Sequence, residues 1–201
     1  MTKTITVATR NPGKTREIAA LAPDYEILTI RDTVPELEIE EDGYTFEENA
    51  MIKAEALWNA LPEKSLVFAD DSGLEIDFFD GFPGIFSARW LGEDTPYSVK
   101  NARVLSDMKD VPDYRRGARY VCAIAVITPE GERFTVKRTM EGRIADEARG
   151  EGGFGYDRIF LVPELGKTTA ELSDEEKNAI SHRGKALRAM FEKLRAAGKI
   201  S

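Results

Sequence analysis

The chain has 201 residues, of which 42% are apolar and 32% are charged, and its formal net charge is −8. This length suits one domain, or two lobes that share one core. The acidic balance argues against a general affinity for nucleic-acid backbones. A small polyanionic ligand can still bind where local cations, backbone amides or a metal ion offset the overall field.

The sequence carries no sign of a membrane or export segment. Its apolar runs stay well below the roughly 18 residues that cross a membrane, and the stretch MTKTITVATRN lacks the pattern of a signal peptide. The single cysteine, Cys122, excludes an internal disulfide and a cysteine-cluster metal site. It lies in the apolar run YVCAIAVI, so we expect it to be buried in a strand. We expect a cytoplasmic protein with no nucleic-acid or membrane partner.

Strands and helices alternate in the first part of the chain. The apolar patterns predict a strand, a helix and a second strand, at residues 4–9, 14–21 and 25–30. An acidic, irregular segment follows. Thr45 and Glu48 then form a T-x-x-E capping box, which predicts a helix from about Phe46 to Leu61 that ends at Pro62.

The second part of the chain predicts paired strands. Two strands, 65–71 and 74–79, flank Ser72 and Gly73, so Asp70 and Asp71 are expected at a strand end. A helix should begin at Thr95, with Pro96 as its first residue, and run to about Met108. Residues 118–128 and 132–141 read as a hairpin, and a second capping box, Ser173 and Glu176, predicts a C-terminal helical region. Because the two long strands are neighbours in the chain, a mixed sheet is favoured over an all-parallel one.

The loop TRNPGK, residues 9–14, leads from a strand into a helix. Such a loop exposes unpaired amides and the positive end of the helix dipole, which suits phosphate. Gly13 permits a close approach to the backbone, and Lys14 adds a charge. The loop is not a Walker A motif, and an ordinary Asn-Pro-Gly turn remains the alternative.

The carboxylates form two groups. Glu40, Glu41 and Asp42 lie in the acidic segment, and one of them can join Asp70 and Asp71 to hold a magnesium ion, which needs only one or two protein carboxylates beside phosphate oxygens. Adjacent strand residues point to opposite faces, so only one of the two aspartates should face the metal, with the other in a supporting position. A solvated charge run and a strand-end turn remain the alternatives.

Three further features are candidates for nucleotide contacts. Lys53 lies within the helix that the first capping box opens, where it can also be a plain surface residue. The stretch GGFGYDR, residues 152–158, places two aromatic side chains among glycines, and bases stack on aromatic faces for roughly 1–3 kcal/mol each. An aromatic turn that caps the core remains the alternative. The stretch EEKNAISHRGKAL, residues 175–187, holds the only histidine, His182, for which a purely structural role remains the alternative. On one straight helix Lys177 and His182 would lie about 140° apart, a limit that a break near Ser181 would relax.

The order of these motifs along the chain is more specific than any one of them. Through TRNPGK, EEDGYTFEENAMIKA, FADDSGLEID, FGYD and EEKNAISHRGKAL, the sequence resembles the inosine triphosphate pyrophosphatase family. The match spans residues 4 to about 190. The resemblance implies an α/β fold with a long, twisted mixed β-sheet and flanking helices, forming one domain over residues 1–201 with two lobes around a central active-site cleft. It also implies a homodimer and magnesium-dependent hydrolysis of ITP, dITP and XTP to the monophosphate and pyrophosphate, which removes these nucleotides from the pool.

The resemblance also assigns roles to single residues. It implies that Asp71 is the proton acceptor, and that Glu41 and Asp71 bind Mg²⁺. It places the substrate on a set of residues drawn from all five motifs: Thr9, Arg10, Asn11, Pro12, Gly13, Lys14, Lys53, Ser72, Phe154, Gly155, Tyr156, Asp157, Lys177, His182 and Arg183. Phe154 is expected to stack on the base, and His182 and Arg183 to lie near the purine 6-oxo group. Arg158 stands where the family usually has proline, which removes a fixed φ angle from the loop.

Other functions fit the motifs less well. A Maf-like nucleotide pyrophosphatase shares the chemistry but acts on other bases, and the SHR and FGYD elements argue against it. A nucleotide sensor without turnover would gain little from the acidic cluster. A haloacid-dehalogenase-type phosphatase needs a spaced D-x-D pair, which ADDSG lacks.

Overall fold

The computed structural model of the chain describes residues 3–200. Its strands form a seven-stranded sheet in the order β2-β1-β3-β4-β5-β6-β7. Their bounds are β1 Lys3–Val7, β2 Tyr25–Thr29, β3 Leu66–Ile76, β4 Gly117–Ile127, β5 Arg133–Ile144, β6 Phe160–Val162 and β7 Lys167–Thr168. Strand β1 is parallel to β2 and β3, whereas β6 is antiparallel to β5 and β7. The sheet is therefore mixed, which confirms the predicted α/β class.

The helices are α1 Pro12–Leu21, α2 Ile30–Thr33, α3 Phe46–Ala60, α4 Tyr97–Asp107, α5 Asp174–Ile180 and α6 His182–Ala196. Both predicted capping boxes are present, at the start of α3 and of α5. The break near Ser181 that the sequence left open is present, because this residue ends α5 in an extended conformation and α6 begins at the next residue. Within residues 3–200, no helix is both long and apolar enough to cross a membrane.

The chain divides into two compact units. Unit 1 comprises Met1–Asp71, Cys122–Arg138 and Arg183–Ser201, and unit 2 comprises Ser72–Val121 and Thr139–His182. Strands β3, β4 and β5 each contribute residues to both units, so the chain changes unit within these strands and again after His182, the first residue of α6.

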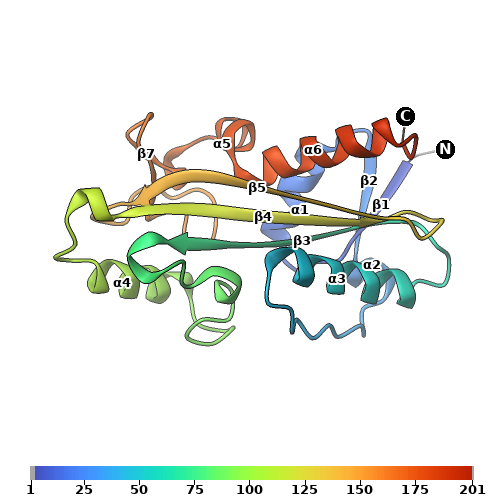
Figure 1. Cartoon of the computed structure of the whole chain (residues 1–201), viewed down its shortest axis with the longest axis horizontal. Helices are drawn as coiled ribbons and strands as arrows, with labels where there is room; N and C mark the ends of the chain where they lie inside the picture. Colours follow the sequence, from blue (N-terminus) through green and yellow to red (C-terminus); the bar gives the residue numbers. More distant parts are fainter. Residues whose placement is uncertain (1–2, 201) are drawn as a thin grey trace. The chain divides into compact units, whose positions relative to one another are not determined.

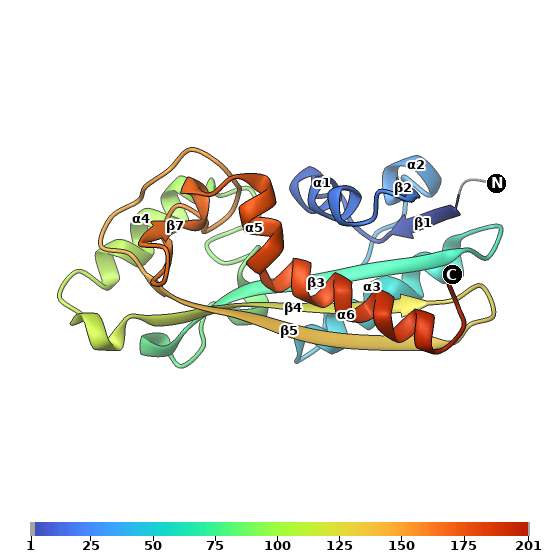
Figure 2. The same cartoon turned by 90° about the horizontal axis from the view of Figure 1, so that it is seen from above.

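Unit 1 has a core on the sheet face that α1 and α6 cover. Ile5, Phe68 and Ile124 of the strands pack there with Ile18 of α1 and Leu187 of α6. Figures 1 and 2 show α6 running along this part of the sheet, and Figure 1 shows α3 on the opposite side. Cys122 is a fully buried member of this core, as expected.

Unit 2 has its own apolar core. Leu74 of β3, Val104 of α4, Met140 of β5 and Phe160 of β6 are all buried in it. Figure 1 shows α4 lying along this part of the sheet. The loop between β5 and β6, which carries FGYD, is anchored in this core by the buried ring of Tyr156.

Several predicted element boundaries are wrong. Residues 77–79, expected in a strand, form a short 3₁₀ helix after β3 ends at Ile76. Strand β3 continues from Leu66 to Ile76 through Ser72 and Gly73, so Asp70 and Asp71 lie inside a strand and not at its end. The small pair does not interrupt the strand, which has the long strand β4 as a hydrogen-bonded neighbour, whereas β1 pairs only with residues 66–68 of β3. Pro96 is the N-cap of α4 with an extended ψ of 140°, so the helix begins one residue later than expected.

Candidate active site

The two aspartates of β3 have different partners, as the alternation of side chains along a strand predicts. Asp70 contacts Lys14 of α1, Cys122 of β4 and Arg183 of α6. Asp71 contacts Lys53 of α3 instead. All of these residues belong to unit 1. The adjacent residues Asp70 and Asp71 therefore belong to two different clusters of charged side chains.

On the Asp71 side, Lys53 joins two carboxylates. Its Nζ donates to Asp71 Oδ1 at 2.8 Å and to Glu41 Oε2 at 3.2 Å. Lys53 is buried, with 7% of its surface exposed, so it is not the plain surface residue that the sequence left open. Burial by itself lowers the pKa of the Lys53 ammonium, but Asp71 and Glu41 outweigh it and the pKa is raised. Lys53 therefore carries its charge at neutral pH and holds both carboxylates.

Asp71 differs electrostatically from an ordinary aspartate. Loss of hydration on burial raises the pKa of its carboxyl, which Lys53 opposes only in part. Its Oδ2 atom is buried and has no hydrogen-bond partner. A buried carboxylate oxygen without a donor is costly, so this atom is available to a water, a proton or a cation.

The donor set on this side suits Mg²⁺. Glu41 and Asp71 supply carboxylate oxygens, the unpartnered Asp71 Oδ2 is one of them, and magnesium commonly uses one or two carboxylates together with substrate phosphates. Across residues 3–200, no group of three or more His, Cys, Asp or Glu side chains forms a complete metal cluster. The residues therefore fit a magnesium ion that phosphate oxygens also ligate.

The acidic segment before α3 is fixed by contacts that the sequence did not suggest. Asn49 is fully buried in α3, one turn before Lys53, and its Oδ1 accepts from the backbone N–H of Gly43 at 2.9 Å. A Cβ atom at Gly43 would lie only 2.6 Å from this oxygen. Arg10 holds the other end of the segment by donating to the backbone oxygens of Pro35 and Leu37, at 2.7 and 2.8 Å. These contacts place Glu41 within reach of Lys53.

The predicted phosphate loop forms the start of α1. Asn11 is the N-cap, and its Oδ1 accepts from the N–H groups of Gly13 at 2.8 Å and Lys14 at 3.3 Å. The Thr9 hydroxyl accepts from the Asn11 N–H at 3.1 Å. The amides that we expected to be open to phosphate are thus already capped, and Pro12 has none. Lys14 is the residue of this loop whose charge lies beside the aspartates.

On the Asp70 side, ionic groups are more deeply buried. Asp70 is 3% exposed and Arg183 is 2% exposed. Arg183 Nε donates to Asp70 Oδ2 at 3.1 Å, and its Nη1 is paired with Glu17 of α1. Burial alone would raise the pKa of the Asp70 carboxyl, but Arg183 and Lys14 hold that pKa well below its usual range. Asp70 is therefore a permanent anion between two cations.

In unit 2, the predicted base-binding loop is organised by Asp157. This buried carboxylate accepts at Oδ2 from the Lys177 ammonium at 2.7 Å and from the Phe154 backbone N–H at 2.8 Å. At Oδ1 it accepts from the hydroxyls of Thr169 at 2.8 Å and Tyr120 at 3.2 Å. Asp157 thus has four donors, so its role in this structure is to shape the loop.

Two aromatic contacts complete the unit 2 group. The Lys177 Nζ lies 4.8 Å from the centroid of the half-buried Phe154 ring. The His182 imidazole stacks on the Tyr120 ring, with 4.7 Å between ring centroids and 16° between their planes. Tyr156 is buried, and its hydroxyl donates to the Ser87 backbone oxygen. Phe154 is therefore the more accessible aromatic ring of the FGYD loop.

The sequence-predicted residues fall into two sets. Unit 1 holds residues 9–14, Glu41, Lys53, Asp71 and Arg183, whereas unit 2 holds Ser72, residues 154–157, Lys177 and His182. Sequence reasoning missed Glu17, Asn49, Tyr120 and Thr169. Glu17 follows Lys14 by three residues, a helical spacing that places both on one face of α1, so this partner was recognisable. The others depend on strand and helix packing.

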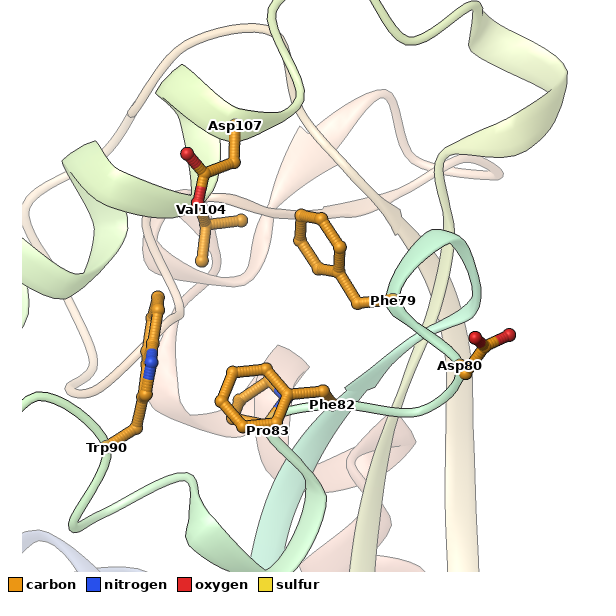
Figure 3. A pocket seen from close by; sticks show the side chains of 7 residues that line it. All are labelled: Phe79, Asp80, Phe82, Pro83, Trp90, Val104 and Asp107. Carbon is orange, nitrogen blue, oxygen red and sulfur yellow. The ribbon is translucent and has the colours of Figure 1, made fainter.

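Unit 2 also has a cavity that none of the site residues named above lines. It has a volume of about 310 Å³ and is lined by Phe79, Asp80, Phe82, Pro83, Trp90, Val104 and Asp107. Figure 3 shows aromatic rings around it and the Asp80 carboxylate turned away from it. Phe82 and Trp90 meet edge to face, with centroids 5.5 Å apart. This cavity is lined mainly by apolar side chains, and no residue of the carboxylate clusters lines it.

Comparison with known proteins gives consistent results. The model of the Ham1 family matches residues 5–193. The dITP/XTP pyrophosphatase of a Bacillus cereus strain is 47% identical over 196 residues, which cover 96% of this chain and 95% of the relative. The dITP/XTP pyrophosphatase of Exiguobacterium sibiricum is 50% identical over 190 residues, covering 92% of this chain and 94% of the relative. The solved structure of the Staphylococcus aureus Ham1 protein superposes with a TM-score of 0.85 at 42% identity, covering 97% of this chain and 100% of that one. The family resemblance read from the sequence is thereby confirmed, and the chain belongs to the Ham1 family.

Proposed function

We propose that this chain hydrolyses non-canonical purine nucleoside triphosphates, namely ITP, dITP and XTP, to the monophosphate and pyrophosphate. The observation that carries the proposal is the Asp71 carboxylate, which is held by Lys53 and keeps one buried oxygen without a partner. The names of the similar proteins support the choice of substrate, since two are dITP/XTP pyrophosphatases. The cellular role would be to remove these nucleotides before polymerases use them.

Asp71 is the proposed general base. Its raised pKa makes the carboxylate a better proton acceptor than an ordinary aspartate. Oδ1 is fixed by Lys53, so Oδ2 is the atom that accepts the proton of the attacking water. The water oxygen bonds to the α-phosphorus, the bond from the α-phosphorus to the α,β-bridging oxygen breaks, and pyrophosphate leaves.

Mg²⁺ is the proposed cofactor, with Glu41 and Asp71 as its protein ligands. When bound, a divalent ion of this kind neutralises phosphate charge and lowers the pKa of water. Lys53 would then set the direction of both carboxylates, since it contacts each of them. Lys14 adds a cation for the phosphates beside this pair.

The base would be recognised by unit 2. The Phe154 ring stacks on the purine, which contributes roughly 1–3 kcal/mol. His182 is held by the stack on Tyr120 and donates to the 6-oxo oxygen of inosine or xanthine. Adenine presents an amino donor at that position, so a buried donor would stay unpaired, and sites built in this way discriminate by roughly 10⁴–10⁵. A contact between Arg183 and the 6-oxo group stays a prediction.

Guanine retains the 6-oxo group, so this contact alone does not reject GTP. The site must then reject GTP through the 2-amino group of guanine. Xanthine carries an oxygen at that position, so a local donor explains the preference better than crowding does. Homodimer formation, a cytoplasmic location and a central cleft between two lobes stay predictions of the family resemblance.

The test is a substrate panel read by pyrophosphate release. ITP, dITP and XTP should be cleaved with far higher kcat/KM than ATP, GTP or dUTP, and EDTA should abolish turnover until Mg²⁺ is restored. Equal kcat/KM for ITP and ATP would refute the base assignment. Release of orthophosphate in place of pyrophosphate would refute attack at the α-phosphorus, and full activity after exhaustive chelation would refute the metal.

A further inference from the structure

Asp70 has no place in the chemistry proposed above, yet it is one of the most deeply buried charged groups in unit 1. We propose that Asp70 is a positioning residue, whose carboxylate holds the Lys14 ammonium in place for the phosphates of the substrate. This inference deepens the proposed function and rests on it. Asp70 touches no reacting atom in this proposal, and it acts through Lys14.

The contacts of Lys14 support this role. Its Nζ forms an ion pair with Asp70 Oδ1 and also lies 3.4 Å from the Asp70 backbone oxygen. Only 15% of the Lys14 side chain is exposed. A lysine carries its charge on a flexible four-carbon chain and loses much rotamer freedom when it is fixed. Because Asp70 already holds the Lys14 side chain, this rotamer freedom is lost before the substrate binds. The ammonium of Lys14 is then placed next to Asp71.

Asp70 is itself held by other elements. Its Oδ2 accepts from Arg183 Nε at 3.1 Å and from the Cys122 Sγ–H at 2.9 Å. Arg183 is in turn paired with Glu17, which lies on the same helix as Lys14. The ionic series Glu17–Arg183–Asp70–Lys14 therefore begins and ends on α1 and alternates in sign. Its net charge is zero, so no charge in the series is left without a partner of opposite sign, and the series fixes the direction of its last member.

Packing alone does not explain a carboxylate here. Replacing buried ionic groups by apolar side chains of similar volume is often neutral or stabilising, so an apolar core under α1 and α6 would serve equally well. A carboxylate is required only if a cation must be directed. The cation that faces the predicted phosphate site is Lys14, since Arg183 is occupied between Asp70 and Glu17.

A double-mutant cycle on ITP hydrolysis tests the proposal. Asp70→Asn and Lys14→Met should each lower kcat/KM by about 10–100-fold, the scale of misplacing a group near the chemistry. If Asp70 acts through Lys14, the double variant should be no worse than Lys14→Met alone. If the kcat/KM losses of the two single variants multiply in the double variant, the proposal is overturned, because two independent roles combine additively in free energy. Activity of Asp70→Asn equal to that of the wild type would overturn it as well.

A matched control uses another aspartate of unit 1. The Asp32 carboxylate accepts from the backbone N–H and the hydroxyl of Thr29 at the start of α2. Asp32→Asn makes the same chemical change at an exposed helix cap. The fold-loss in kcat/KM that Asp32→Asn causes, however small, should multiply with the fold-loss caused by Lys14→Met. Coupling between Asp32 and Lys14 equal to that of Asp70 would show that the cycle reports general destabilisation, and would overturn the proposal.

Two further measurements separate the possible failures. The first is the Kd of Mg²⁺-pyrophosphate, measured by calorimetry on the wild type, the two single variants and the double variant. Binding needs no turnover, so the coupling between Asp70 and Lys14 is measurable even if ITP is not the substrate. If Asp70→Asn does not fold, nitrogen-15 NMR of the lysine ammonium groups in the wild-type protein replaces it, with Lys14→Arg to assign the signal. A Lys14 ammonium protected from exchange with water supports the proposal. A rapidly exchanging one overturns it.

Discussion

Replacing Asp157 by asparagine should strongly destabilise unit 2 while leaving the volume of the side chain nearly unchanged. Asp157 is 3% exposed and Lys177 is 5% exposed, and the ammonium lies 2.7 Å from Oδ2. Breaking one side of a buried ion pair costs about 3–5 kcal/mol, because the remaining charge is left without compensation. An asparagine also turns one acceptor into a donor, although all four contacts of Asp157 come from donors.

Glu151 offers a control in the same loop region. Its carboxylate lies 3.4 Å from Arg158 Nη2, but 92% of the Glu151 side chain is exposed. Exposed pairs of this kind contribute about 0–1 kcal/mol. Glu151→Gln should therefore unfold in urea almost like the wild type, whereas Asp157→Asn should lose about 3–5 kcal/mol of unfolding free energy.

Two more readouts locate the effect. In hydrogen exchange, the Phe154 amide should lose protection in Asp157→Asn, since Oδ2 accepts from it. In a double-mutant cycle, Lys177→Met should recover much of the loss, because the uncompensated charge is gone. A loss below about 1 kcal/mol for Asp157→Asn, like that of an exposed pair, would refute the argument that this carboxylate is the centre of the loop.

Three further predictions concern catalysis, metal and pH. Asp71→Asn should lower kcat for ITP by about 10²–10⁴ with an unchanged circular dichroism spectrum; wild-type activity would remove Asp71 as the base. Glu41→Gln should raise the Mg²⁺ concentration that gives half-maximal activity, and an identical Mg²⁺ titration would exclude Glu41 as a ligand. The pKa values of Tyr97, Tyr120 and Tyr156 all lie above the ordinary 10.0 because of burial. Unfolded tyrosines therefore lose protons first, and unfolding free energy should fall as pH rises above 10; Tyr120→Phe should flatten that fall, and an equally steep fall would contradict the assignment.

Local signals in the sequence predicted the elements well where the chain itself contains the cause. Capping boxes place an N-cap and its partner three residues apart, so the starts of α3 and α5 were readable from Thr45 and Ser173. The hairpin of β4 and β5 has its turn residues between two apolar runs, and Gly131 does adopt a positive φ of 87°. These features depend on neighbours within a few residues.

The prediction failed where a residue's environment comes from distant parts of the chain. Ser72 and Gly73 read as a break, because both residues weaken an isolated strand. In the sheet, the long strand β4 is a hydrogen-bonded neighbour of β3, and this pairing outweighs local preference, whereas β1 reaches only residues 66–68. The amides of Gly13 and Lys14 are a local exception: they looked open, but the side chain of the N-cap residue Asn11 accepts from both of them.

The Asp70–Asp71 pair shows most directly what sequence alone leaves undetermined. Alternation along a strand predicted that the two carboxylates diverge, and they do, yet it did not predict which cation each would meet. Asp71 finds Lys53 at a separation of 18 residues, whereas Asp70 finds Cys122 and Arg183 at separations of 52 and 113 residues. Those partners give the neighbouring groups opposite properties, since the pKa of Asp70 is lowered and that of Asp71 is raised. Two adjacent and chemically identical residues can therefore supply a fixed anion and a proton acceptor, because the packing of α1, α3 and α6 gives each its own partners.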